Sequence, residues 1–334
     1  MPDSKERRVI SLRICVPILI AAICLLSLLA LRIGSARLSM RQILEALSST
    51  EGPVRAIILD IRLPRVILSI LIGGCLSAAG TILQAVMHNP LADPGIIGVS
   101  SGASAVATAV FLILPTASRS VPMFAFAGAL IACAAIYGMA WRGGAEPVRV
   151  VLAGVAVNAM LGGVTAFLML MNSENLQGVL AWMNGSLNAK SWGQARVMMA
   201  YGAVGLTMAA LSVKNLNALQ MGDEIAQSLG VHVGRVRLIL TGISAFLAAS
   251  TVSVAGIIGF VGLIVPHVAR MVVGANHKRM LPVAMLLGAC VVLLADLVGR
   301  TIVAPVEIPV GIVMSIFGGP FFLYLLRHRK RTGL

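Results

Sequence analysis

The chain has 334 residues, of which 58% are hydrophobic and only 11% are charged. A soluble domain carries about 25% charged residues, so this composition excludes an ordinary soluble fold and predicts a chain whose solvent is mostly lipid. The net charge of +14 does not indicate a nucleic-acid partner, because the basic residues stand mostly between apolar runs and at the termini, where they report membrane topology.

Apolar runs of about 20 residues, the length needed to cross the hydrocarbon as a helix, follow one another along the chain. Region 238–274 is too long for one span, and the segment GIIGFVGLIVPH leads us to split it near Gly256. We therefore expect about ten transmembrane helices in one polytopic domain covering residues 1–334. The other expected spans are 14–31, 66–87, 96–114, 121–141, 148–171, 193–213, 281–299 and 308–326.

The first run raises one alternative, a cleaved signal peptide. Its eighteen apolar residues exceed the 7–15 of a typical signal-peptide core, so we favour a retained span. The five cysteines are scattered singly and no CxxC occurs, which indicates neither a zinc site nor a disulfide framework. We expect no metal and no cofactor.

Lys and Arg positions predict the orientation of the spans. With both termini inside, sixteen of the 26 basic residues fall in cytoplasmic segments, as the positive-inside rule requires. One outer segment breaks the trend, because Arg32 to Arg65 carries six arginines. These arginines either anchor the second span at the headgroups or serve a partner outside.

Between the sixth and seventh spans stands a stretch that reads like a soluble surface, NALQMGDEIAQSLGVHVGRVR, residues 217–237. It predicts a short helix in a cytoplasmic loop at about 214–237. A two-turn helix does not hold together alone in water, so it needs a surface to lie on. That surface is either the membrane face of this chain or a partner protein.

This stretch resembles the EAA loop of ABC importer permeases, the helix that docks into the ATP-binding subunit, although Ile225 replaces the second Ala and no Leu-Pro follows. The resemblance implies ATPase coupling through Gly222, Asp223, Glu224, Ala226, Leu229 and Gly230.

Five further blocks, in order from about Ser39 to the C-terminus, are similar to the FecCD-type permeases. They are RLPR (62–65), NPLADPGIIGVSSGA (89–103), GIIGFVGLIVPHVAR (256–270), LLADLVGR (293–300) and EIPVGIVMSIFGGPFFLYLL (307–326).

That family imports ferric siderophores, haem or cobalamin, and membership implies a type II ABC importer permease. It implies a dimer, expected here to be a homodimer, with two cytoplasmic ATP-binding subunits and an extracytoplasmic substrate-binding protein. The chain would lie in the bacterial inner membrane. Basic residues at the positions of Arg62, Arg65 and Arg300 pair in the family with acidic residues of the binding protein.

Proline and glycine interrupt the chain at two matching places. The prolines of HNPLADPGIIG deny the backbone its helix bonds, and such backbone is tolerated at membrane depth only inside protein or facing water. Pro94-Gly95-Ile96-Ile97-Gly98 is echoed by Ala255-Gly256-Ile257-Ile258-Gly259. This echo is what an inverted repeat of helices 2–5 on helices 7–10 gives.

Gating residues are expected at these breaks and in a seam of small residues on the second span, where helices approach closely. The candidates are Gly73, Gly74, Pro94, Gly95, Gly98, Gly256, Gly259 and Pro266. His267 reads as an ordinary interfacial histidine. Methionines near the fifth and sixth spans form either a soft pathway wall or simple packing.

The chain does not hydrolyse ATP itself, because a P-loop needs Gly followed by Lys and none of its five lysines follows a glycine. An ion-coupled secondary transporter is the rival reading. It needs an ionisable group within the membrane, and only Asp296, with Arg300 four residues on, lies inside a predicted span. No charged ring supports a passive channel. Among family substrates we favour a ferric siderophore, with haem and cobalamin left open.

Overall fold

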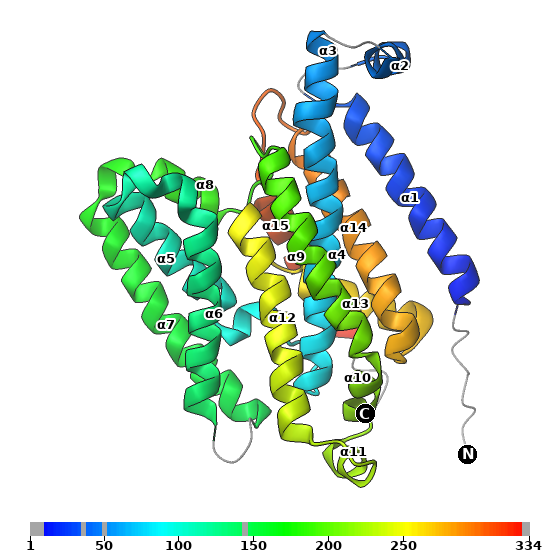
Figure 1. The fold of residues 1–334 in the computed structure, drawn as a ribbon, viewed down its shortest axis with the longest axis vertical. Helices are drawn as coiled ribbons and strands as arrows, with labels where there is room; N and C mark the ends of the chain where they lie inside the picture. The colour runs from blue at the N-terminus through cyan, green and yellow to red at the C-terminus, as the bar shows by residue number, and fades with distance from the viewer. Residues whose placement is uncertain (1–9, 35–37, 49–51, 142–145, 329–334) are drawn as a thin grey trace.

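The computed structural model describes residues 10–34, 38–48, 52–141 and 146–328 (Figure 1). Within these ranges every regular element is a helix. Along the chain the α-helices are α1 (Leu12–Arg32), α2 (Met40–Ser48), α3 (Pro53–Ala56), α4 (Leu63–Val86), α5 (Val99–Ile113), α6 (Val121–Ala140), α7 (Pro147–Met171), α8 (Gln177–Met183), α9 (Trp192–Leu211), α10 (Val213–Gln220), α11 (Asp223–Ser228), α12 (Val233–Ala255), α13 (Val261–Val273), α14 (His277–Gly299) and α15 (Val310–His328).

Short non-α turns join several of these helices. A π-helical turn, Ile57–Arg62, makes α3 and α4 one continuous rod, and 3-10 turns stand at Pro94–Ile97, Pro115–Ser120 and Ser173–Asn175. The expected break near Gly256 is confirmed, because α12 ends at Ala255 and Gly256 caps it with φ +76°. That positive φ suits glycine, which lacks a Cβ.

Six helices of the described ranges are long and apolar enough to cross a membrane. They contain α1, α4, α6, α7, α12 and α14. The pair α9–α10, bent by 50°, gives a seventh if it counts as one span, and α5, α13 and Val310–Tyr324 of α15 are shorter apolar helices. Each expected run therefore coincides with a helix, while the count of ten spans stays a prediction.

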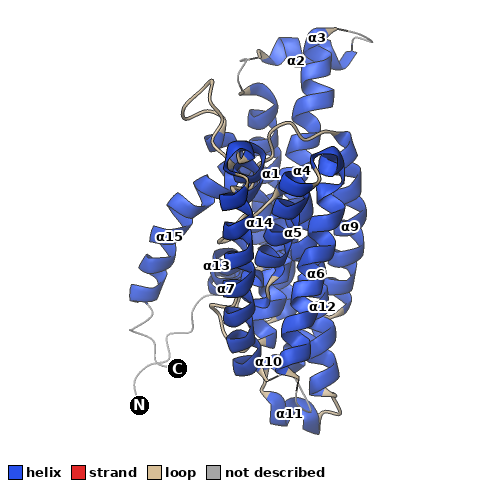
Figure 2. Cartoon of the chain, turned by 90° about the vertical axis from the view of Figure 1, so that its left-hand side faces the viewer, coloured by secondary structure: helices blue, strands red, loops and turns tan. Residues whose placement is uncertain are grey.

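The two ends of the molecule carry different elements. Helix α11 lies at the lower end and the helices α2 and α3 at the upper end (Figure 1). Helix α1 begins below mid-height and runs toward the upper end (Figure 1), and just before it the Ile10 N–H donates to the carbonyl of Val272 near the end of α13. Helix α15 descends toward the lower end, leaning away from the bundle (Figure 2).

Helix α4 is the centre of the fold, with twenty of its 24 residues buried. It packs against α14, α12, α13 and α9. The close packing depends on glycine: a Cβ at Gly73 would overlap the carbonyl of Gly288 on α14, and one at Gly80 would overlap the carbonyl of Gly262 on α13. Gly74 differs, because a Cβ there would lie 3.6 Å from the Met285 carbonyl, an ordinary contact.

Substitution of Gly73 by Ala therefore tests the α4–α14 packing. We expect Gly73→Ala to lower the free energy of unfolding by about 1–3 kcal/mol, since overpacking a filled contact costs that much. Gly74→Ala, one residue away with the same gain in helix propensity, is the control and should be near neutral. Thermal unfolding of the purified protein in detergent distinguishes them, and equal melting temperatures for the two variants would contradict the packing described.

Candidate functional site

Helix α11, the expected coupling helix, forms where the sequence predicts it. Gly222 and Gly230, with φ of +101° and +80°, bracket it. Asp223 and Glu224 occupy its first turn, where carboxylates favour the helix dipole. The last turn closes through hydrogen bonds from the N–H groups of Gly230 and Val231 to the carbonyls of Gln227 and Ala226.

The two sides of this helix differ in exposure. Ala226 is fully buried against the bundle. Met221, just before Gly222, and Ile225 and Leu229, on α11 and at its C-terminal cap, are 56%, 47% and 62% exposed, and the four-residue spacing of Ile225 and Leu229 places those two on one face of the helix. We call these three residues the apolar stripe. Exposed apolar groups gathered at a helical loop indicate a contact surface.

An ion pair holds α11 to the bundle. The guanidinium of Arg237, on α12 and only 5% exposed, donates from Nη2 to both carboxylate oxygens of Asp223 at 2.9 and 3.1 Å. At the preceding helix, the Nε2 atom of His88, just after α4, lies 2.7 Å from the Leu219 carbonyl. The apolar stripe therefore stands on an anchored support.

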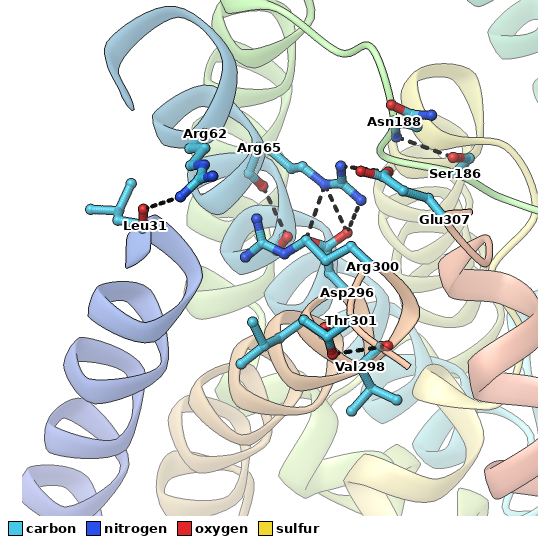
Figure 3. A network of polar contacts seen from close by, with 12 residues as sticks. Leu31, Arg62, Arg65, Ser186, Asn188, Asp296, Val298, Arg300, Thr301 and Glu307 are labelled. Carbon is cyan, nitrogen blue, oxygen red and sulfur yellow. Dashed lines mark hydrogen bonds and ion pairs between the residues drawn. The ribbon is translucent and has the colours of Figure 1, made fainter. Parts of the chain in front are cut away.

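At the upper end, the structure brings three separate blocks into one ionic network (Figure 3). Arg65 of α4 donates from Nε to the two oxygens of Asp296 on α14 at 3.0 and 3.1 Å. Its Nη2 lies 2.9 Å from Asp296 Oδ1, and its Nη1 donates to Glu307 at 2.8 Å. The expected pair of Asp296 with Arg300 is present, with Nε and Oδ2 3.8 Å apart.

This network is buried, unlike the exposed rim that docking to a partner suggests. Arg62, Arg65 and Arg300 are 5%, 8% and 3% exposed. Arg62 donates to the Leu31 carbonyl at the end of α1. Burial lowers the pKa of Arg300, with the nearby Asp296 carboxylate opposing the shift. The contacts of these arginines thus connect α1, α4, α14 and the segment before α15. Docking of a partner through them stays a prediction.

The first break in the helices, at Pro94–Ile97, is fixed by polar contacts. Asp93 accepts from the Gly95 N–H at 2.8 Å, and burial raises the pKa of its carboxyl while this hydrogen bond opposes the shift. Asn158 of α7 donates to the Gly95 carbonyl at 3.2 Å. Gly98 then opens α5 with φ +83°. The break is therefore built into the packing between α4, α5 and α7.

The second break, residues 256–260, lies against the loop that follows α8. The Ser186 N–H donates to the Ala255 carbonyl at 2.7 Å, and the Gly311 N–H donates to the Gly185 carbonyl at 3.0 Å. Past Gly259, Phe260 takes a positive φ of 67° at the start of α13. Further along that helix Pro266 is buried and His267 is half-buried.

Groups of histidine, cysteine and carboxylate side chains that could hold a metal ion do not occur among the described residues. The methionines near the fifth and sixth expected spans are divided between exposed members such as Met160 and Met171 and the fully buried Met198, which favours the simple packing alternative. Sequence reasoning missed the Arg65–Asp296–Glu307 contacts, although opposite charges at the ends of neighbouring apolar runs were the available signal.

Comparison with known proteins identifies the family to which this chain belongs. The profile of the FecCD transport family matches residues 19–328. The chain belongs to the FecCD transport family. Its members are ABC-transporter permeases, membrane-spanning subunits whose ATPase is a separate subunit, in agreement with the lack of a Walker A motif in this chain.

Individual relatives cover nearly the whole chain. The Fe(3+)-citrate import system permease protein YfmE of Bacillus subtilis is 38% identical over 94% of this chain and 95% of its own. The hemin transport system permease protein HmuU of Yersinia pestis is 38% identical over 96% and 97%. A solved chain, described as an inward-facing metal-chelate type ABC transporter, superimposes with a TM-score of 0.85 at 27% identity, covering 95% and 99%.

The buried network yields a stability prediction. Asp296→Asn removes the charge that partners two buried guanidiniums, and breaking a buried ion pair on one side costs about 3–5 kcal/mol. We expect a large drop in melting temperature and in the yield of folded protein. Glu45→Gln is the control, because its pair with Arg41 is exposed and such pairs contribute little. A melting temperature for Asp296→Asn equal to that of the control would contradict the network.

Proposed function

We propose that this chain is the permease subunit of an ATP-driven importer and forms, as a homodimer, the translocation pathway for a bulky metal chelate. Two cytoplasmic ATP-binding subunits engage α11, and an extracytoplasmic binding protein delivers the cargo at the opposite end. The observation that carries the proposal is the apolar stripe, because it presents three large apolar side chains to solvent in the loop that contains α11.

The architecture proposed is the type II importer permease with ten spans in one domain, residues 1–334, and a coupling loop at about 214–237. Both termini then lie in the cytoplasm of a bacterium, with the chain in its inner membrane. The alternation of helices supports this, because α1 begins and α15 ends toward the end that carries α11 (Figures 1 and 2).

Matching contacts support the inverted repeat of helices 2–5 and 7–10. A Cβ at Gly154 on α7 would overlap the Ile96 carbonyl, and a Cβ at Gly311 on α15 would meet the Ile257 carbonyl at 2.7 Å. Ile96 and Ile257 are equivalent in the echoed PGIIG and AGIIG segments. Each half thus presses a glycine of its last helix onto the same position of its break. We assign the gating movement to these two breaks.

We favour a ferric siderophore as the cargo, because a relative as similar as any reported above is named for an iron(3+) chelate. Haem stays a second candidate, since an equally similar relative is named for hemin transport, and cobalamin a third, from a relative in Halobacterium salinarum 40% identical over 84% of this chain. The rival ion-coupled mechanism is disfavoured by Asp296, whose carboxylate is bound to Arg65 and faces Arg300 rather than being available for proton exchange.

Leu229→Asp tests ATPase engagement. A charge placed in an apolar contact is costly, so we expect the affinity for the ATPase subunit to fall more than about tenfold while the permease still folds. Ser228→Asp adds the same charge at the neighbouring exposed position, off the stripe, and is the control. Copurification of the ATPase with each variant measures the effect. Equal recovery with Leu229→Asp and with the wild type would refute docking on the stripe.

Docking of the binding protein at the upper end requires accessible charge. The buried Arg62, Arg65 and Arg300 exceed their two carboxylates Asp296 and Glu307 by one positive charge, which adds to the local field. Arg32 and Arg41 are exposed at this end. We propose that the buried arginines fix the positions of the helix ends on which the binding protein docks. The exposed arginines then steer an acidic partner toward these helix ends.

The variant Arg32→Glu/Arg41→Glu tests this steering. We expect a slower association rate with the binding protein at low salt, a difference that shrinks as salt rises because the Debye length shortens, and a nearly unchanged dissociation rate. Lys278→Glu, exposed at the opposite end, is the control. Surface plasmon resonance over a salt series measures both rates. An association rate at low salt equal to that of the control would rule out electrostatic steering by these residues.

A further inference from the structure

The side-chain amide of Asn217, on α10, contacts the start of α14 through both its oxygen and its nitrogen. Its Oδ1 accepts from the His277 N–H at 2.8 Å and lies 3.0 Å from the Nδ1 of the His277 ring. Its Nδ2 donates to the Asn276 Oδ1 at 3.2 Å, and that oxygen also caps α14 by accepting from the Lys278 N–H at 2.9 Å. One side chain of α10 thus contacts the cap and the first residue of a membrane-spanning helix.

Helix α10 is held on a second side by α4. The contact is between the Leu219 carbonyl and the Nε2 of His88, whose backbone takes an unusual φ of +48°. Leu216 and Leu219 are fully buried, so apolar packing holds the helix in place in addition to the hydrogen bonds. The start of α14 and the segment just after α4 are therefore both bound to the same two-turn helix, α10.

Helix α10 leads directly into the coupling helix. The Met221 and Gly222 N–H groups donate to the carbonyls of Ala218 and Leu219, at 3.1 and 3.0 Å. A displacement of α11 is therefore passed to α10 and, through α10, to α14 and α4, in addition to the path to α12 through Asp223 and Arg237.

Those two helices form one body from end to end. In the middle their backbones touch at Gly73 and Gly288, and at the upper end Arg65 binds Asp296. Packed interiors deform little, so small shifts at one end of such a pair move the other.

The geometry points to Asn217 as a positioning residue that transmits movement of the coupling helix to α14 and, through it, to the upper end. This inference rests on the proposed function, because the movement is driven by an ATPase bound to α11. The side chain acts mainly as an acceptor: two of its three contacts are made by Oδ1 on His277.

The test measures transmission without needing the identity of the cargo. Val303→Cys places a thiol in the segment between α14 and α15, at a position 52% exposed. The background is Cys24→Ala, because the other four cysteines are buried. The probe is the rate at which a water-soluble maleimide labels that thiol in the reconstituted complex with the ATPase, with and without a non-hydrolysable ATP analogue.

In this parent we expect the nucleotide to change the labelling rate, and Asn217→Ala to reduce that change about fivefold while the ATPase still copurifies. Asn215→Ala, on the exposed face of the same helix, should respond as the parent does. Asn217→Asp keeps both acceptor contacts with His277 but replaces the Nδ2 donor to Asn276 by an oxygen, so it should restore the response in part. A purely structural role for Asn217 would instead lower the melting temperature and leave the nucleotide response intact.

The outcomes distinguish a failure of the proposed function from a failure of the role assigned to Asn217. If the parent recruits no ATPase, the proposed function fails and this inference fails with it. If the parent recruits the ATPase and responds to nucleotide, and Asn217→Ala responds equally, the inference alone is overturned. An Asn217→Asp variant as unresponsive as Asn217→Ala would also overturn it, because the acceptor contacts would then not carry the movement.

Discussion

The contact between the backbones of α4 and α14 is the constraint on which the rest of the structure depends. Glycine at positions 73 and 288 lets the two backbones meet, with the Ser77 side chain in the space that a Cβ on Gly288 would fill. Small residues allow helices to associate in this way in lipid, where apolar burial provides no driving force. With these helices joined, Arg65 reaches Asp296 at one end. At the other end both helices reach α10, through His88 and Asn217.

This arrangement pairs the charges at the upper end of the bundle and binds backbone groups at the two breaks in its helices. A guanidinium at the edge of the hydrocarbon is costly unless paired, and Arg65 is paired twice. At the two breaks, backbone groups lack the hydrogen bonds of a continuous helix, which lipid would not tolerate. Asn158 binds such a group at the first break, and the loop at Ser186 binds one at the second. Many of the polar contacts therefore lie at the ends of the helices and at the breaks, while apolar packing fills most of the remainder.

Much of this was predictable from the sequence, for identifiable reasons. Long apolar runs and the Gly/Pro interruptions predicted helices and breaks because lipid allows few alternatives, and the break at Gly256 is found where expected. Helix α11 followed from Asp223, Glu224 and the glycines that bracket it. Burial of Arg62, Arg65 and Arg300 did not follow, because charge alone does not say which acid lies opposite: Arg65 and Asp296 are 231 residues apart. Likewise, Gly73 and Gly74 look alike in sequence. Only the position of α14 shows that Gly73 has no room for a Cβ and that Gly74 does.

In the proposed importer, α11 faces the cytoplasm and is covered by a separate ATPase. The most direct measurement is labelling of an Ile225→Cys variant, in the Cys24→Ala background, by a membrane-impermeant maleimide in vesicles of both orientations. The account predicts rapid labelling only when the cytoplasmic face is accessible, and strong protection once the purified ATPase subunit is added. Labelling from the extracytoplasmic side, or a rate unaffected by a bound ATPase, would contradict it.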